Sequence, residues 1–530
     1  MRVIIAEKPS AAEKIAFALS GKKLKAEGKV PEYEFSVDGE KVVVVPAVGH
    51  LYTVDSPHKG IPVLSKDLEW KPIKKVQSLI KKFKEYADAD EVIVATDYDT
   101  EGSLIGYNIV KYALGRDPKD VRRMVFSTMT ASDLKNAYNS LKPMDILQAI
   151  SGETRHEVDY IFGITLSRAL MHSLKSAGLF SKLSVGRVQS PTLAFVYFQE
   201  HEIKTFVPLP YWKLSASFVY NGTKFDAEYR ERIESENLAY ELFTRCGESF
   251  RVVELKKTQV DVSPPVPMNL SDLQSIAYSA FGFSPAKTLK IAERLYLAAL
   301  ITYPRTSNQQ FPESIDLRSI VGALSRQKKY AQYAEKILKG SLVPTKGPGT
   351  DPAHPPIHPT GEIPEELSDD EQKLYDLIVR YFLSIFYENS RRERTLIRLD
   401  NNGVEFRARG STIVFPGWLE VIGPYTSLDE EILPPIQEGE ILKGIPHLQV
   451  KYTSPPSRYN PSSLLKKMEK EEIGTKATRA EIIETLFTRG YIENHAIKIT
   501  ELGEIVAEIL LKFFPDLTDV SMTRELENNI

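Results

Sequence analysis

Apolar runs of strand length alternate with segments of helical spacing in the N-terminal part of the chain. Arg2–Ala6, Lys41–Val45 and Glu91–Ala95 are short apolar runs, whereas Pro9–Leu19 and Lys74–Ala87 place apolar side chains at helical intervals. Strands that alternate with helices are typical of a parallel sheet covered by helices. The pattern therefore predicts an α/β domain that begins at the first residue.

The pattern of apolar and polar positions changes several times in the rest of the chain. A linker with three prolines near position 265 separates a β-type part from a helical part. The successive segments are 145–200 (helical), 211–253 (β), 270–300 (helical), 344–359 (a Pro- and Gly-rich loop), a helix ending near 387, 393–452 (β) and a helical remainder from 461. Because β and helical segments recur, the chain is predicted to cross between domains more than once.

Length and composition define a broad class. A chain of 530 residues suggests about three to five domains. Its 42% hydrophobic and 26% charged residues are ordinary for a globular protein. No apolar run approaches the roughly 18 residues of a membrane helix, and the N-terminus lacks a signal-peptide pattern, so we expect a cytoplasmic protein without a membrane partner.

The cysteine count excludes two features, and the net charge constrains how the protein could bind DNA. The single cysteine, Cys246, excludes an internal disulfide and a multi-cysteine zinc site, and we expect no zinc within this chain. The formal net charge of −3 has the opposite sign to that of a wholly basic nucleic-acid-binding protein. If the protein binds DNA, its basic residues must be concentrated in one groove.

Acidic residues follow the third predicted strand at alternate positions. Asp97, Asp99 and Glu101 can converge at the carboxyl edge of the sheet, and Glu7 reaches the same edge if the first and third strands are neighbours. Clustered carboxylates repel one another unless a cation is bound, and Mg²⁺ prefers such oxygen ligands. The sequence predicts a magnesium site here; the alternative is a solvated acidic loop.

A tyrosine follows the helical segment that ends near position 300. Pro304 disfavours helix at Tyr303, so the chain there is predicted to be extended, with Arg305 on the same side. A phenol can attack phosphorus and form a covalent ester, and a guanidinium can stabilise the phosphate charge. Lys8 is a candidate donor of a proton to the leaving oxygen. Tyr-Pro-Arg is a weak signal by itself, because most of the 25 tyrosines are expected to be packing residues.

Two sequence blocks carry a family resemblance. IIAEKPS (4–10) followed by VIVATDYDTEG (92–102) resembles the Toprim domain, and LITYPRTS (300–307) resembles the active-site signature of type IA DNA topoisomerases. The resemblance implies Mg²⁺ at Glu7 and the acids, with Tyr303 as nucleophile. The chain differs from the usual sequence of these family motifs at five positions: Tyr98, Thr100, Ser103, Ala299 and Ser307.

Four more blocks resemble the same family. They are GHL (49–51), LSVGRVQSPTL (183–193), DPAHPPIHPT (351–360) and SRYNPSSLLKKMEKEEIGTKAT (457–478). By resemblance, His354 helps to bind the scissile phosphate. The residues expected to contact DNA are Arg187, Gln189, Arg458, Tyr459, Lys476 and Thr478. Without the resemblance, these blocks would be a core histidine at His50, a helix start, a Pro-rich loop and solvent-facing lysines.

The resemblance covers almost the whole chain and is strongest to the archaeal topoisomerase III branch. It implies a multidomain α/β, α and β fold in a four-domain torus. The expected domains are 1–145 (Toprim), 146–205 with 456–530 (helical, DNA-gripping), 206–265 with 391–455 (β-rich hinge) and 266–390 (helical, with the tyrosine). In the family, the chain usually continues beyond this point, often into a zinc-binding region, so we expect a truncation here; the alternative is a naturally minimal protein.

The implied activity is ATP-independent. One DNA strand is cut through a 5′-phosphotyrosine, another strand passes and the ends are rejoined, so that negatively supercoiled DNA is relaxed or linked DNA is decatenated. The expected partner is single-stranded or underwound DNA, bound by a monomer that could work with a helicase. Two alternatives stay open: a Toprim-type nuclease or primase-like enzyme, and a non-catalytic single-stranded DNA clamp.

Overall fold

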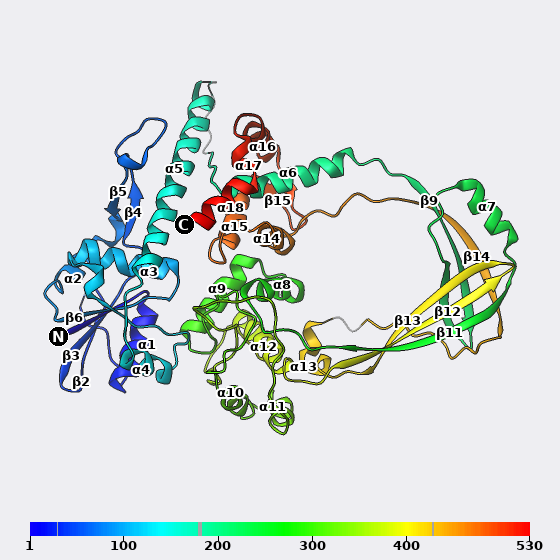
Figure 1. Ribbon diagram of the computed structural model, residues 1–530, viewed down its shortest axis with the longest axis horizontal. Coiled ribbons are helices and arrows are strands. Elements are labelled where there is room, and N and C mark those ends of the chain that lie inside the picture. The colour runs from blue at the N-terminus through cyan, green and yellow to red at the C-terminus, as the bar shows by residue number, and fades with distance from the viewer. Residues whose placement is uncertain (29, 177, 179–182, 427–428) are drawn as a thin grey trace.

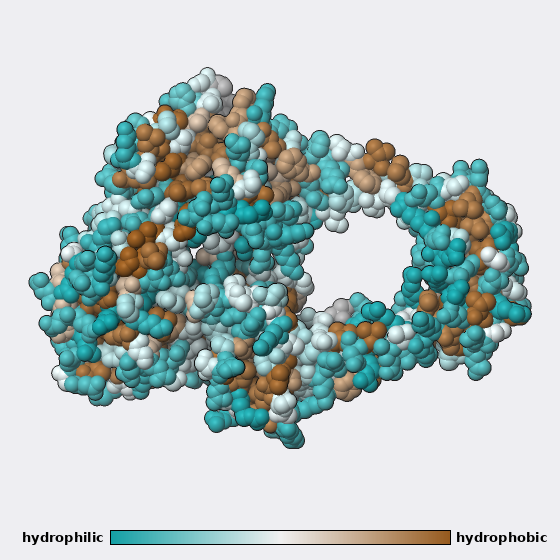
Figure 2. Space-filling view, in the orientation of Figure 1, coloured by the Kyte–Doolittle hydropathy of each residue, from teal (hydrophilic) through white to brown (hydrophobic). Residues whose placement is uncertain are grey.

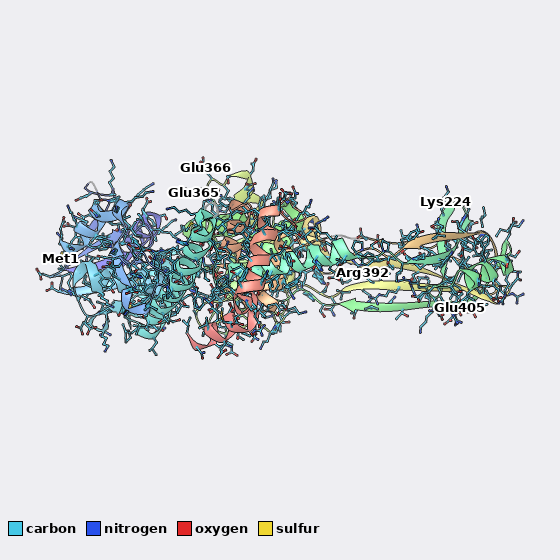
Figure 3. The ribbon with its side chains drawn as sticks, turned by 90° about the horizontal axis from the view of Figure 1, so that it is seen from above. Met1, Lys224, Glu365, Glu366, Arg392 and Glu405 are labelled. Carbon is cyan, nitrogen blue, oxygen red and sulfur yellow. The ribbon has the colours of Figure 1, made fainter. Side chains whose placement is uncertain are left out.

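The chain forms a ring with a thick end and a thin end. The computed structural model describes residues 1–28, 30–176, 178, 183–426 and 429–530. An α/β region and two helical regions make the thick end, and a β barrel lies at the far side of a wide hole (Figures 1 and 2). Seen from above, the barrel extends away as a narrow arm that bears Lys224, Arg392 and Glu405 (Figure 3). The hole is therefore framed by parts that are distant in sequence.

The N-terminal region is built on a six-stranded sheet in the order β2-β3-β1-β6-β7-β8. Its central pairs are parallel, as predicted, while β2 and β8 pair antiparallel at the edges. The strands are β1 (Arg2–Ala6), β2 (Tyr33–Val37), β3 (Glu40–Pro46), β6 (Glu91–Ala95), β7 (Arg122–Arg123) and β8 (Lys142–Pro143), with a separate hairpin of β4 (Tyr52–Asp55) and β5 (Glu69–Pro72). We call this part, with its helices, the sheet region.

Helices cover both faces of this sheet. They are α1 (Pro9–Ser20), α2 (Gln77–Lys84), α3 (Thr100–Asn108), which continues as a π-helical turn (Ile109–Leu114), and α4 (Ala131–Asn139). The central strands are buried on both sides, which explains why they are continuous apolar runs rather than alternating ones. Ala6 of β1 lies beside Ala95 of β6, so Glu7 and Asp97 leave the sheet at the same edge.

A second region joins helices from two distant parts of the chain. Residues of these helices share one hydrophobic cluster. Its helices are α5 (Ile146–Ser176), α6 (Gln189–Thr205), α14 (Pro461–Lys470), α15 (Arg479–Thr488), α16 (Glu501–Phe513), α17 (Pro515–Thr518) and α18 (Val520–Asn529), with a short hairpin of β15 (Ile492–Glu493) and β16 (Lys498–Ile499). We call them the clamp helices; α5 also packs against α3 of the sheet region.

A third region, the tyrosine region, contains α8 (Leu270–Phe281), α9 (Pro285–Leu297), α10 (Leu317–Leu324), α11 (Ala331–Leu338) and α12 (Asp369–Ser384). The predicted helical segment from 270 to 300 is two helices. Gly282, with φ 69°, ends α8, and the Ser284 hydroxyl accepts a hydrogen bond from the Lys287 amide at the start of α9.

The β segments close into one antiparallel barrel in the order β10-β13-β12-β11-β14-β9. The strands are β9 (Pro210–Tyr220), β10 (Thr223–Tyr229), β11 (Ser249–Val262), β12 (Ser390–Asn401), β13 (Val404–Phe415) and β14 (Ile441–Tyr452). The first β segment supplies β9, β10 and β11, the second supplies β12, β13 and β14, and β11 pairs with both β12 and β14.

Part of the first β segment was predicted wrongly. Within 211–253 the structure has a helix, α7 (Glu236–Arg245), which buries Ala239 and Leu242. Ser235 provides its N-cap by accepting a hydrogen bond from the Leu238 amide. A further short helix, α13 (Leu419–Ile422), follows β13.

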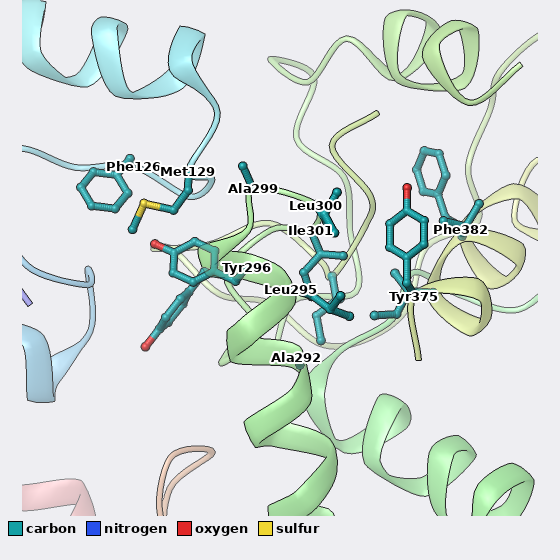
Figure 4. Packing of buried hydrophobic residues seen from close by; sticks show 14 of the residues in the cluster. Phe126, Met129, Ala292, Leu295, Tyr296, Ala299, Leu300, Ile301, Tyr375 and Phe382 are labelled. Atoms are coloured by element: carbon teal, nitrogen blue, oxygen red, sulfur yellow. The ribbon is translucent and has the colours of Figure 1, made fainter. Parts of the chain in front are cut away.

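The sheet region and the tyrosine region share a continuous hydrophobic core. Phe126 and Met129 of the sheet region belong to the same cluster as Tyr296 and Tyr303, and Figure 4 shows Phe126 and Met129 beside Tyr296. We call this contact the gate interface. Separating the two regions must expose apolar surface, at a cost of about 25 cal/mol per Å². Among the residues described, no helix is both long and apolar enough to cross a membrane.

Candidate active site

The acidic edge of the sheet is compact and almost closed to solvent. Glu7 is 9% and Asp97 5% exposed. The Asp97 amide donates to Glu7 Oε2 at 3.0 Å. Lys8 Nζ lies 3.4 Å from Glu7 Oε1 and 3.8 Å from Asp97 Oδ2. Burial, followed by the charge of Glu7, raises the pKa of Asp97 well above its usual range. Such mutual repulsion is what a bound cation would relieve, so these residues fit a divalent metal.

Asp99 lies at the start of α3 and caps it. Its Oδ1 accepts a hydrogen bond from the Gly102 amide at 2.7 Å. A Cβ atom at Gly102 would lie 2.1 Å from the backbone oxygen of Asp97. Gly102 is therefore required by the close approach of two backbone segments, and not by the sharp turn that glycine often permits.

Gly102→Ala is expected to displace the acidic loop. Because the added methyl meets rigid backbone, we expect a loss of about 2–4 kcal/mol in the free energy of unfolding. Urea unfolding with and without Mg²⁺ would measure it. Gly115→Ala is a poor control, because the φ of Gly115 is 66° and alanine would be strained there. Ala113→Gly, in the helical turn that continues α3, is the better control for a Gly/Ala exchange nearby. An unchanged midpoint for Gly102→Ala would contradict the packing argument.

Glu101 has partners different from those of the other acids. His50 Nε2 and His156 Nε2 lie 2.9 and 3.0 Å from the same oxygen, Glu101 Oε2. Burial acts to raise the pKa of Glu101, but the hydrogen bonds and charges of His156 and His50 together outweigh it and lower the pKa below its usual value. The structure thus brings Glu7, Asp97 and Asp99 together around the candidate nucleophile and places Glu101 in a second group.

A buried arginine was missed by the sequence analysis. Arg123, on the short strand β7, is 1% exposed and donates to the Asp97 backbone oxygen at 2.7 Å and to Thr96 Oγ1 at 2.6 Å. Burial lowers its pKa to about 10, so it stays charged at neutral pH. It offsets part of the negative charge of the acids. No motif marks it, because β7 is only two residues long.

Tyr303 reaches the acids from the opposite side of the gate interface. The chain turns after α9 through Ala299, whose φ of 67° is the left-handed conformation that favours glycine. The Tyr303 amide then donates to the Ser127 backbone oxygen at 2.9 Å. The ring is 2% exposed, and the phenol donates to Asp99 Oδ2 at 2.6 Å. The structure therefore joins the predicted tyrosine to the predicted acids.

A second tyrosine was also missed. Tyr296, the penultimate residue of α9, donates from its phenol to Asp97 Oδ1 at 3.2 Å. Its ring meets that of Tyr303 edge-on at 5.2 Å. Most of the 25 tyrosines were expected to be packing residues, and nothing in the sequence around Tyr296 indicates a contact with a distant acid.

The phenol of Tyr303 is protonated in this closed arrangement. Burial, followed by the charge of Asp99, raises its pKa well above the usual value. Arg305 lies beside it: its Nη1 is 3.8 Å from Asp99 Oδ2, and its Nη2 is 2.6 Å from Glu293 Oε1. Burial lowers the pKa of Arg305, but Tyr303, Glu293 and Asp99 more than reverse this, so the guanidinium remains charged.

His354 completes the group. Its ring centroid lies 4.5 Å from that of Tyr303. His354 Nε2 is 2.9 Å from the Tyr98 backbone oxygen, to which it donates, and Nδ1 is 3.3 Å from Ser127 Oγ. Burial lowers the pKa of His354 to about 4, so the imidazole is neutral at pH 7.

Acid is expected to weaken the closed protein through two histidines. Burial also lowers the pKa of His358 to about 4, against a usual value of 6.5. The unfolded chain therefore binds protons first, and stability is lost as the pH falls from 6.5 towards 4, by up to about 3 kcal/mol for each histidine. Above pH 7 this contribution is constant.

Thermal unfolding between pH 7.5 and 4.5 measures this effect, with His358→Phe as the comparison. His358 lies among Phe311 and Phe382, so phenylalanine retains its packing and removes its titration. The variant should lose less stability on acidification than the native chain. Equal losses would contradict the assignment.

Three of the predicted DNA-binding residues line one pocket. Arg187, Gln189 and Thr478 surround a cavity of about 260 Å³ at the starts of α6 and α15. Arg187 is 2% exposed and pairs with Asp159 at 2.9 Å and Glu527 at 2.8 Å. In this state the positive charge of Arg187 is therefore neutralised by carboxylates of the protein itself.

The other predicted DNA-binding residues are also engaged within the protein. Arg458 pairs with Glu200, and Tyr459 packs against the core of the clamp helices. Lys476 pairs with Asp351 of the tyrosine region, and this ion pair links two regions that are separate in sequence. Any DNA contact by these side chains requires the present partners to be exchanged.

Comparisons with known proteins agree with this arrangement. Residues 2–129 match the Toprim domain, a metal-binding domain, and residues 144–530 match the family described as DNA topoisomerase. DNA topoisomerase 1 of Pyrococcus horikoshii is 44% identical, over 100% of this chain and 80% of that protein. That of Methanocaldococcus jannaschii is 41% identical, over 100% and 71%. The structure of full-length topoisomerase I from Thermotoga maritima matches with a TM-score of 0.78 at 29% identity, covering 99% of this chain and 85% of that one.

The Toprim sheet, the two helical regions and the β barrel form one ring, and the acidic site with its tyrosine lies within it. This combination is typical of an enzyme that acts on DNA strands. The chain belongs to the type IA DNA topoisomerase family, as the resemblance implied. It is an isomerase whose substrate is DNA. Its closeness to topoisomerase III stays a prediction, because the archaeal relatives above are named DNA topoisomerase 1.

Proposed function

We propose that Tyr303 is the nucleophile of this topoisomerase. The observation that carries the proposal is the contact of its phenol with Asp99, 2.6 Å away, within the acidic group that also contains Glu7 and Lys8. The phenol loses its proton to water as its oxygen attacks, an O–P bond forms, and the bond from phosphorus to the 3′-oxygen breaks. The product is a 5′-phosphotyrosine, which retains the energy for rejoining, so no ATP is needed.

The neighbouring residues have distinct proposed tasks. Arg305 binds the phosphate oxygens and stabilises the charge that develops on them. Lys8 donates a proton to the leaving 3′-oxygen, and His354, as a neutral imidazole, helps to hold the scissile phosphate. Glu7, Asp97 and Asp99 would hold Mg²⁺, which supplies electrostatic stabilisation to the ends that are rejoined.

Because the gate interface is closed, the tyrosine region must move before DNA can bind. Tyr303 is buried, so DNA can reach it only if the tyrosine region separates from the sheet region. We infer that the barrel acts as the hinge and the clamp helices hold the strand, following the predicted division into 1–145, 146–205 with 456–530, 206–265 with 391–455, and 266–390. The buried, narrow site favours single-stranded or underwound DNA, handled by a monomer that could receive such DNA from a helicase.

The test uses short single-stranded oligonucleotides labelled at the 3′ or the 5′ end. The protein is mixed with each and denatured rapidly. A covalent adduct that retains only the 3′ label, with the bond mapped to the Tyr303 peptide, is expected. An adduct on the other side of the break would contradict the proposal, and cleavage without an adduct would favour a Toprim-type nuclease. Binding without cleavage would favour a clamp.

A further inference from the structure

Two histidines and a glutamate converge beside the acidic site, at the start of α3, where α5 packs against it. His50 follows β3, Glu101 lies in the first turn of α3, and His156 lies on α5. Their three ligand atoms lie within 4.8 Å of one another. The two rings approach at 5.0 Å between centroids. They therefore join the sheet region to the clamp helices at one point.

The local backbone fixes each side chain. Gly49, with φ 87°, turns the chain ahead of His50, and its amide donates to the Glu7 backbone oxygen at 3.2 Å. Trp70 of β5 lies 6.0 Å from the His156 ring and donates to Glu157 Oε1 at 3.2 Å. The group is thus supported by three separate elements rather than lying on a mobile surface.

The donor set matches a borderline metal ion better than magnesium. Two imidazole nitrogens and one carboxylate, with a fourth position left for water, form a common set for Zn²⁺, whereas Mg²⁺ prefers oxygen ligands. Tetrahedral bonds of about 2.0–2.1 Å place ligand atoms about 3.3 Å apart. Nitrogen-to-oxygen distances of 2.9 and 3.0 Å need only a few tenths of an ångström of expansion.

The side chains are also accessible. The exposed fractions are 26% for His50, 25% for Glu101 and 33% for His156, which leaves a path for an ion and a bound water. We propose that His50, Glu101 and His156 form a second metal site, specific for Zn²⁺-like ions and separate from the Glu7–Asp97–Asp99 group. The expectation of no zinc depended on the cysteine count, and this site uses no cysteine.

The site would have a structural consequence. An ion bound there ties α5 to the start of α3, the helix that Asp99 caps. It would hold Glu101 away from the acids around Tyr303, so that two neighbouring carboxylates serve different ions. This proposal does not depend on Tyr303 chemistry and can fail or succeed separately from it.

Cobalt is a visible probe for the site. The full chain, freed of metal with a chelator and kept in excess Mg²⁺ to fill the acidic group, is titrated with Co²⁺. About one Co²⁺ per chain should give the visible absorption of a four-coordinate ion, and Zn²⁺ should displace it. His156→Ala and His50→Ala should weaken binding at least about 100-fold. His172→Ala, an exposed histidine on the same helix, should have no effect.

Two further measurements distinguish loss of the metal site from misfolding of the histidine variants. X-ray absorption of the native protein with one Zn²⁺ should show two imidazoles and one carboxylate at about 2.0–2.1 Å. Asp97→Asn should leave Co²⁺ binding unchanged. No absorption, an ion with oxygen ligands alone, or binding that survives the double change of His50 and His156 would each overturn the proposal.

Discussion

Tyr303→Phe is expected to lower the rate of DNA relaxation by at least about 10⁴-fold, because it removes the atom that forms the bond to phosphorus. The substitution deletes one oxygen from a ring that is 2% exposed, so packing at the gate interface is retained. Only the hydrogen bond to Asp99 is lost, and Asp99 keeps the Gly102 amide as a donor. A supercoil-relaxation assay over a wide range of enzyme concentrations measures the loss.

The matched control is Tyr296→Phe. Tyr296 is equally buried and also donates to an acid of the site, through Asp97, but it lies on the helix and not in the extended segment. We expect its relaxation rate to fall by less than about tenfold. Both variants should bind single-stranded DNA with native affinity. If Tyr296→Phe is inactive and Tyr303→Phe is active, the nucleophile has been assigned to the wrong ring.

The sequence predicted the acidic edge well because simple geometry determines it. Three strands were continuous apolar runs, and parallel neighbours place their carboxyl ends together. Glu7 and Asp97 therefore had to meet once β1 and β6 paired. The location of Tyr303 against Asp99 was not accessible in this way, since the two residues are 204 positions apart. It followed from the family resemblance.

Other features could not be predicted for identifiable reasons. Arg123 contacts the acids from a two-residue strand and Tyr296 from a packed helix, and neither position differs from ordinary core in its pattern. Helix α7 was missed because Ser235 and two buried positions define it within a β-rich segment. For Glu101, the alternation of acids indicated one cluster, but the helix that starts at Thr100 rotates its carboxylate towards His50 and His156.

Several basic residues predicted to bind DNA have protein carboxylates as partners here. Arg187 pairs with Asp159 and Glu527, and Lys476 pairs with Asp351. Phosphate can replace such carboxylates because it offers similar oxygen acceptors. Under the proposed mechanism, such an exchange at Lys476 would remove one contact between the tyrosine region and the clamp helices.

Asp97→Asn combined with Asp99→Asn is expected to slow rejoining by at least about 100-fold, with initial cleavage reduced less than tenfold. Asparagine retains the size of both side chains and, through its remaining oxygen, the cap of α3. The change removes both charges and replaces one acceptor oxygen of each side chain by an amide donor. Charge repulsion among the buried acids also disappears. Without metal, the variant should therefore be more stable than the native protein, by about 1 kcal/mol.

Magnesium provides the decisive comparison. The melting temperature of the native protein should rise with Mg²⁺ concentration, because an ion that binds only the folded state stabilises it, and that of the double variant should not. Asp117→Asn, at an exposed helix cap of the same region, should behave as the native protein does. Cleavage and rejoining are separated by high-salt reversal of the covalent adduct on a labelled oligonucleotide. Equal losses in both steps would show that the carboxylates act on the attack of Tyr303 itself, and an unchanged response to Mg²⁺ would place the ion elsewhere.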